Sequence, residues 1–217
     1  MKRTLVVSLL AVVSLAAFAQ DIPLSKPPAK LGMDVLDAIR ARSASRAFVK
    51  RDVSVADLSA IAWAGNGQKG TADAVSAASK AGSTIPVSGD VDYITLYILT
   101  AKGVYRFDPV ANVLKQVTTR DARGDITAEN IATAAFMVLY TMDTTKAPAF
   151  MKGNPAQFRE IAVATASYGA QNIGLVAAGL KLSTIVMYNI KADAAAAAAK
   201  MPKEEVPLFI MQVGYTQ

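Results

Sequence analysis

Apolar residues recur at helical spacing in several stretches of the chain. Positions 33, 35, 36 and 39 form one apolar face and predict a helix over residues 33–41. Ser54, with Asp57 three residues later, is suited to cap a second helix, which we expect to end at Trp63 before a run of glycines. Pro155, at a favoured first-turn position, begins the longest predicted helix, which runs to about residue 180.

Strand patterns fill the middle and the end of the chain. Residues 92–100 are rich in β-branched, aromatic and aliphatic side chains, and Lys102-Gly103 predicts a tight turn into a return strand at 104–107. The remaining predicted elements are strands at 113–118, 135–142, 182–189 and 207–215, and helices at 127–133 and 192–201. Helices that precede a strand meander indicate an α+β fold with a mixed or antiparallel central sheet flanked by helices.

Two segments precede the predicted domain. Residues 1–19 combine a basic start, a short apolar run and a small-x-small end at 17–19, which is typical of a secretory signal peptide. The apolar run is shorter than the roughly 20 residues of a membrane-spanning helix, so we expect cleavage and no stable membrane insertion afterwards. Residues 20–32 hold three prolines and predict an extended leader, either mobile or strapped across a surface. We therefore expect a periplasmic or secreted protein with one domain at 33–217.

The composition excludes many catalytic chemistries. The 217 residues include no Cys and no His, so the chain by itself offers no disulfide, thiol nucleophile, Cys/His zinc site or Ser-His-Asp triad. The formal charge of +6 falls to +4 when Lys2 and Arg3 leave with the signal, and no basic cluster with interleaved aromatic residues is present. We expect neither nucleic-acid binding nor a metal site.

The carboxylates do not form a recognisable constellation. Glu160 and the pair Glu204-Glu205 are expected to be solvated, and the acidic residues between 121 and 129 lack the spacing of a calcium loop.

Residues 71–83, rich in Ala, Ser and Gly, predict either a mobile lid or a weak helix. Gly174 and Gly179 predict close packing of backbones against the longest helix.

The segment that follows the first predicted helix is the best candidate for a site. Arg42 and Arg46 stand four residues apart with Ser43 and Ser45 between them. Guanidinium groups bind phosphate oxygens bidentately, and hydroxyl or backbone N–H groups complete such a site. The same residues also fit a solvated basic turn in which Arg42 caps the helix, and the spacing leaves both interpretations open.

The wider sequence resembles the FMN-dependent nitroreductase family. Residues 37–48 resemble the family's opening motif, roughly Arg-Arg-Ser-x-Arg-x-Phe, and the meander at 93–109 is similar to the branch that contains the SagB/ThcOx-type dehydrogenases. Further segments follow in the family's order: Trp63-Ala64-Gly65-Asn66-Gly67, residues 84–92, Gln171-Asn172 with Gly179-Leu180, and Val213-Gly214-Tyr215. Together these segments cover about residues 33–217.

The resemblance implies an α+β homodimer that holds FMN at the subunit interface. It places Arg42, Ser43, Arg46 and Asp90 at the cofactor and designates no catalytic residue. It further implies an exported oxidoreductase that passes hydride or electrons between a reductant and a small organic substrate. Flavin chemistry needs neither Cys nor His, which agrees with the composition.

Four positions depart from the family pattern. Ala44 stands where the family has a Ser, Asp90 and Asp92 replace an Asn and a Gln that face the flavin, and Met187 replaces a basic residue. These changes support an alternative function, a binding protein that keeps the fold and has lost the flavin and redox catalysis.

Overall fold

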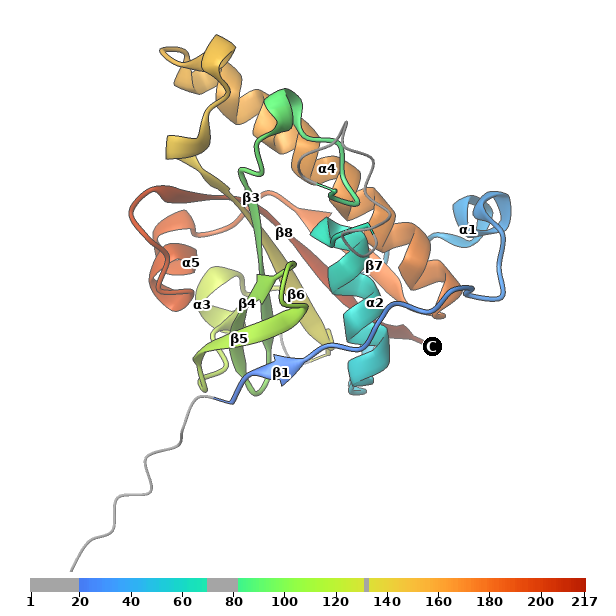
Figure 1. Ribbon diagram of the computed structural model, residues 1–217. Helices are drawn as coiled ribbons and strands as arrows, with labels where there is room; N and C mark the ends of the chain where they lie inside the picture. The colour runs from blue at the N-terminus through green and yellow to red at the C-terminus, as the bar shows by residue number, and fades with distance from the viewer. Residues whose placement is uncertain (1–19, 70–81, 131–132) are drawn as a thin grey trace, which may run out of the picture.

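The computed structural model describes residues 20–69, 82–130 and 133–217 (Figure 1). The predicted signal at 1–19 lies outside these ranges, as does most of the segment 71–83 that predicts a lid or a weak helix. The fold is α+β, as expected from the sequence, with an antiparallel sheet and helices on both of its faces. No helix in the described ranges combines the length and the apolar character that crossing a bilayer requires.

Within the described residues, eight strands form one sheet in the order β1-β5-β4-β3-β6-β8-β2, and β7 pairs with β8. All these strand pairs are antiparallel. The strands are β1 (Ile22–Pro23), β2 (Phe48–Val49), β3 (Ile94–Thr100), β4 (Gly103–Asp108), β5 (Val113–Thr118), β6 (Phe136–Asp143), β7 (Ser183–Met187) and β8 (Glu205–Thr216). The predicted meander and the strands that follow it are confirmed.

The helices cover the two faces of the sheet. They are α1 (Val35–Ala41), α2 (Val55–Asn66), α3 (Arg123–Ile126), α4 (Pro155–Gly179) and α5 (Ala192–Ala198), with short 3-10 turns at Ser88–Asp90, Thr144–Lys146 and Ala149–Met151. The helices α2 and α4 pack side by side over one apolar cluster, whereas α5 covers a second cluster on the opposite face (Figure 1). Each central strand is therefore buried on both sides.

Local capping signals determine where the helices begin. The Ser54 hydroxyl accepts from the backbone N–H of Asp57 at 3.0 Å and donates to its carboxylate at 2.8 Å, so the predicted cap is confirmed. Asn154 caps α4 in the same way, accepting from Gln157 N–H at 3.1 Å. The end of α2 differs from the prediction, since the helix continues past Trp63 to Asn66. Asn66 is buried there and donates to the carbonyl of Ile94 at 2.8 Å.

The backbones of α2 and α4 come closest at Gly65 and Gly169. A Cβ added at Gly169 would lie 2.3 Å from the carbonyl oxygen of Gly65, so only hydrogen fits between the helices there. Gly174 and Gly179, where the sequence predicts close backbone packing, instead face the side chains of Arg42 and Leu31. These two glycines make room for side chains rather than for a neighbouring backbone.

The leader is strapped to the domain, one of the two predicted possibilities. Its strand β1 pairs with β5, and Leu24 exchanges backbone and side-chain hydrogen bonds with Asn112. Farther along, Leu31 packs against the end of α4 at Gly179. The leader therefore adds an edge strand to the sheet and then crosses the face covered by α2 and α4 (Figure 1).

The predicted helix at 127–133 is wrong over the described residues 127–130. The helix in this part of the chain is the shorter α3, which ends at Ile126. Beyond it, the Thr127 hydroxyl accepts from the Glu129 N–H, and Asn130 has a positive φ of 55°. A side chain that bonds to nearby backbone competes with helix formation, which explains the early end.

Glu205 is buried, contrary to the expectation that it is solvated. Its carboxylate accepts from Arg106 at 2.7 Å and from the Tyr97 hydroxyl at 2.9 Å, and its side chain is 4% exposed. Burial, together with the negative charge of Glu205, raises the pKa of Tyr97 to about 12. This cluster ties the start of β8 to β3 and β4.

Candidate functional site

The segment that links α1 to β2 runs beside β7. Ala44 forms a parallel bridge with Thr184, Ser45 N–H donates to the Thr184 carbonyl at 3.2 Å, and Thr184 N–H donates to the Ser43 carbonyl at 3.4 Å. Alternate side chains of extended backbone point to opposite sides. Arg42 and Ala44 accordingly border one pocket, while the Ser43 hydroxyl lies 3.0 Å from that of Ser183.

Arg42 lies across α4 at Gly174. A Cβ added at Gly174 would lie 3.2 Å from Cδ of Arg42, so the glycine leaves space for the arginine stem. Ser167, Gln171 and Gly174 are spaced by four and three residues and therefore share this face of α4. The helix thus positions Arg42 beside a polar stripe of small and amide side chains.

The resulting pocket has a volume of about 310 Å³, at the lower end of the range of roughly 300–1,000 Å³ for small-molecule sites. Among its described lining residues, only Arg42 is ionised at neutral pH. Apolar side chains of β7 and β8 form much of the remaining wall. Its described lining residues are Arg42, Ala44, Ser167, Ala170, Gln171, Gly174, Thr184, Ile185, Val186, Phe209 and Met211. The pocket therefore suits a ligand with one anionic group and an apolar body.

The other sequence candidates lie outside this pocket. Arg46 donates to the Glu129 carboxylate at 3.4 Å, with both side chains largely exposed. Asp90 is exposed at the end of the 3-10 turn Ser88–Asp90, which packs against Pro148 and Phe150, just before the start of α4. Of the four predicted cofactor residues, the structure therefore places Arg42 alone in this pocket.

The departures from the family pattern also have definite positions. The Asp92 carboxylate accepts from Asn66 Nδ2 at 3.5 Å and from Ile94 N–H at 3.3 Å, and burial raises its pKa. Met187 is buried in the cluster on the far side of the sheet, whereas Thr184, Ile185 and Val186 of the same strand border the pocket. The position at which the family has a basic residue therefore holds an apolar side chain in this chain, and that side chain does not line the pocket.

The side chains of Gln171 and Asn172 lie on different sides of α4 and have different contacts. Gln171 borders the pocket, whereas Asn172 Nδ2 donates to the carbonyls of Thr84 and Ala64 at 3.2 and 3.4 Å. Asn172 therefore holds α4 to the end of α2, and Gln171 is the member of the pair that can meet a ligand.

Large apolar side chains remain exposed on elements that contribute to the pocket or lead into it. Tyr168, beside Ser167 on α4, and Tyr188, whose ring lies 5.2 Å from that of Phe209, are both more than half exposed. The helix α1, which packs against α4 and leads directly into Arg42, exposes Val35, Leu36 and Ile39 to a similar extent. Contiguous exposed apolar residues of this kind mark an interaction surface.

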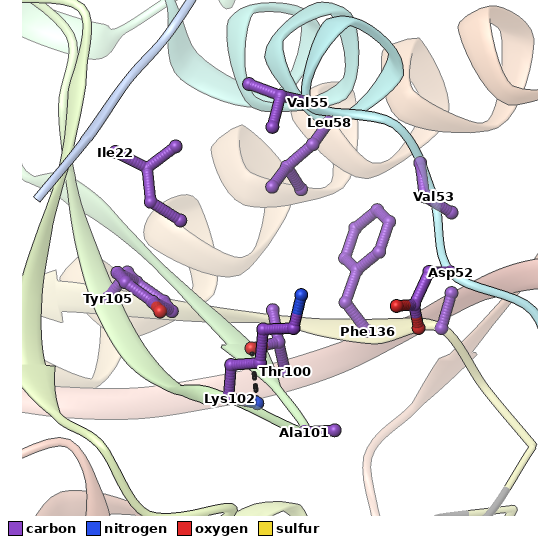
Figure 2. A pocket seen from close by; sticks show the side chains of 11 residues that line it. Ile22, Asp52, Val53, Val55, Leu58, Thr100, Ala101, Lys102, Tyr105 and Phe136 are labelled. Atoms are coloured by element: carbon purple, nitrogen blue, oxygen red, sulfur yellow. Dashed lines mark hydrogen bonds between the residues drawn. The ribbon is translucent and has the colours of Figure 1, made fainter. Parts of the chain in front are cut away.

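A second cavity lies under the leader, beside the N-terminal end of α2. Figure 2 shows the amine of Lys102 pointing into it, the carboxylate of Asp52 at its side, and Leu58 and Phe136 as apolar walls. Its volume of about 120 Å³ is well below the usual size of a ligand site, and it shares no described lining residue with the Arg42 pocket. The Arg42 pocket is therefore the candidate functional site.

Sequence reasoning missed much of the pocket lining, including two residues on one face of β7. Thr184 and Val186 are two residues apart on the strand that the sequence predicts at 182–189. Because every second residue of a strand points to the same face, the sequence could have placed both side chains on one face. The pairing of this strand with residues 43–45 depends on contacts distant in sequence and gave no local signal.

The model of the nitroreductase family matches residues 39–215, most of the chain. The chain belongs to the nitroreductase family. Members of this family generally bind flavin as FMN, and the fold agrees with the assignment. No curated protein matches the chain significantly.

Solved structures of nitroreductase-type proteins share the fold at low sequence identity. A protein of Ralstonia eutropha JMP134, described as a nitroreductase, superposes with a TM-score of 0.76 at 21% identity, covering 91% of this chain and 90% of that one. One from Anabaena variabilis ATCC 29413 gives 0.72 at 18% identity, over 93% of this chain and 42% of the longer one. A chain of the Escherichia coli microcin synthetase McbBCD complex gives 0.65 at 15% identity, over 99% and 85%.

Proposed function

We propose that this protein is an FMN-dependent oxidoreductase whose flavin binds in the Arg42 pocket. The observation that carries the proposal is the position of Arg42, which lies across Gly174 and is the sole ionised group among the described lining residues. The glycine at 174 leaves room for the arginine stem, and the guanidinium matches the charge of a flavin phosphate or of the reduced ring. The residues of the pocket therefore fit FMN.

The flavin, when bound, supplies the chemistry: it accepts a hydride or an electron pair and passes it to an organic acceptor. The chain supplies binding and orientation. The Arg42 guanidinium donates to the anionic group, and Gln171 offers both a donor and an acceptor to polar edges of the ligand. The apolar side chains of Val186 and Phe209 exclude water from the uncharged part.

We further propose that two copies of the chain form a homodimer that closes the pocket. Val35, Leu36 and Ile39 expose apolar surface on α1, the helix that leads into Arg42, and Tyr168 exposes its ring next to the pocket residue Ser167. A self-complementary patch repeated by a two-fold axis would cover this surface on both copies. Asp90 and Arg46, which do not reach the pocket of their own chain, could then contribute to the partner's site.

We also propose that the enzyme works in the periplasm or outside the cell. The signal-like segment at 1–19 supports this location, and the leader that follows is docked from Gln20 onward. The similarity of the meander at 93–109 to the SagB/ThcOx-type branch supports an organic substrate that is itself oxidised or reduced at the flavin.

A second candidate function is a binding protein of the same fold without flavin. Met187, where the family has a basic residue, and the Arg46–Glu129 ion pair favour it, because both reduce the positive charge offered to a phosphate. The two functions differ in whether FMN binds at all.

The test is an FMN titration of purified residues 20–217, followed by the flavin absorption bands and by fluorescence quenching. We expect a flavin-binding protein whose affinity falls about tenfold or more in Arg42→Ala, since a charge-assisted contact is lost. Arg40→Ala is the matched control, because Arg40 is exposed and pairs with Asp37 one turn earlier on α1. Absence of binding at high FMN concentration would overturn the oxidoreductase proposal and support the binding protein.

A further inference from the structure

Thr184 carries a hydroxyl at the wall of the Arg42 pocket. The residue is 4% exposed, and both of its backbone hydrogen-bonding groups are engaged by residues 43–45. Its Oγ1 makes no hydrogen bond with any described residue, although the residue lines the pocket. Because no described side-chain polar atom is both buried and unpartnered, this hydroxyl stays accessible, and its place in the pocket lining makes it available to a ligand.

The Thr184 hydroxyl and the Arg42 side chain converge on one place. Measured from the position of a Cβ on Gly174, Arg42 Cδ lies at 3.2 Å and Thr184 Oγ1 at 3.9 Å. A glycine at this point leaves both groups accessible from the same side of α4. Because the guanidinium begins one bond beyond Cδ and both residues line the pocket, an anion bound in the pocket can meet the guanidinium and the hydroxyl together.

The hydroxyl groups of the neighbouring segment are used elsewhere. Ser43 Oγ lies 3.0 Å from Ser183 Oγ, and Ser45 Oγ accepts from the N–H of Ala47 at 3.0 Å. Between them, Ala44 faces the pocket without a polar group and is bridged directly to Thr184. Bridged residues on neighbouring strands are about 4.8 Å apart and present their side chains on the same face. Thr184 therefore places a hydroxyl beside the position where the segment lacks one.

Arg46 is held away from this place by a separate network. Glu129, its ion-pair partner, also accepts from Asn189 Nδ2 at 3.0 Å, and the Glu129 carbonyl accepts from the buried Gln212 at 2.6 Å. Asn189 and Gln212 thus fix the position of Glu129, and the ion pair with Glu129 in turn holds Arg46. The cation nearest to Thr184 is Arg42.

We infer that Arg42 and Thr184 together form the phosphate subsite for FMN, with Thr184 supplying the hydroxyl donor that Ala44 cannot supply. This inference rests on the proposed function, since it assigns the residues that select the phosphate-bearing form of the flavin. A phosphate monoester accepts two hydrogen bonds from a guanidinium and one from a hydroxyl with good geometry. Arg46 contributes little to this selection in the single chain.

The test compares FMN with riboflavin, which has the same ring system and no phosphate. Dissociation constants for both flavins are measured on the wild-type chain 20–217 and on Thr184→Val, Thr184→Ala and Thr184→Ser. We expect the Val and Ala variants to lose about tenfold in FMN affinity, with riboflavin affinity unchanged within about twofold. The Ser variant, which keeps the hydroxyl, is expected to bind FMN within about threefold of wild type.

Unchanged riboflavin binding also shows that a variant has kept its pocket. Two hydroxyl-free variants are used so that the test still stands if one of them fails to fold. If wild type binds FMN and the Val and Ala variants bind it equally well, the subsite is wrong while the oxidoreductase proposal stands. Equal loss of both flavins in these variants, or loss in Thr184→Ser, also overturns the subsite. If wild type binds neither flavin, the proposed function fails and the subsite falls with it.

Discussion

The carbonyl oxygen of Gly65 and the α-carbon of Gly169 approach so closely that a Cβ on Gly169 would lie 2.3 Å from the oxygen. This contact fixes the crossing of α2 and α4, and α4 in turn carries Gly174 and Gln171 to the pocket. The geometry of the candidate site therefore depends on a backbone contact one to two helical turns away.

Gly169→Ala is expected to destabilise the protein by about 3 kcal/mol, because the helices must separate against a packed core. Gly179→Ala is the control, since its Cβ would meet only the side chain of Leu31, at 3.1 Å, and helix propensity improves by about 1 kcal/mol. Urea unfolding of both variants measures the difference. Equal stability of the two variants would contradict the close crossing of α2 and α4.

Glu205→Gln is expected to lower stability by about 2 kcal/mol, because Arg106 and Tyr97 lose a buried carboxylate acceptor. The neighbouring Glu204→Gln provides a matched control, since the Glu204 side chain is 38% exposed and its pair with Lys203 is a surface contact. Denaturant unfolding of the two variants distinguishes them. A loss in Glu204→Gln as large as that in Glu205→Gln would refute a special role for the buried cluster.

Alkaline stability is expected to depend on Tyr97. Burial and Glu205 raise its pKa to about 12 in the folded protein from an ordinary value of 10.0. Because the folded-state pKa is the higher one, this tyrosine contributes stability that is complete below pH 10 and is lost as the pH rises towards 12. The Tm of wild type should therefore fall more between pH 9 and pH 11 than the Tm of Tyr97→Phe. Parallel pH profiles of the two proteins would argue against this titration.

Dimer formation is expected to depend on the apolar face of α1. Ile39→Glu places a charge on that face and should convert a dimer into a monomer, which analytical ultracentrifugation detects. Val110→Glu alters an even more exposed apolar side chain at the turn between β4 and β5 and should leave the dimer intact. If Ile39→Glu sediments like wild type, a different surface must close the pocket.

Local signals in the sequence predict much of the fold. The cap at Ser54, the proline at 155 and the meander at 92–118 act over a few residues, and the corresponding elements are present. The prediction failed at 127–133, where short-range side-chain hydrogen bonds end the helix at Ile126. An alternation of polar and apolar residues does not reveal such bonds.

Features that depend on distant contacts could not be predicted in this way. Glu205 is buried because Tyr97 and Arg106, about a hundred residues earlier, supply its hydrogen bonds. Thr184 enters the candidate site through pairing with a segment near residue 44, which a sequence motif does not encode. Arg42, by contrast, could be singled out because its residue type and spacing already fit an anion.

The most direct test of the flavin site is a crystal structure of residues 20–217 grown with an excess of FMN. We expect flavin density in the pocket between α4 and β7, with the phosphate within hydrogen-bonding distance of the Arg42 guanidinium and the Thr184 hydroxyl. Flavin bound elsewhere, such as in the cavity beside Lys102, or a pocket without density despite excess FMN, would contradict the assignment.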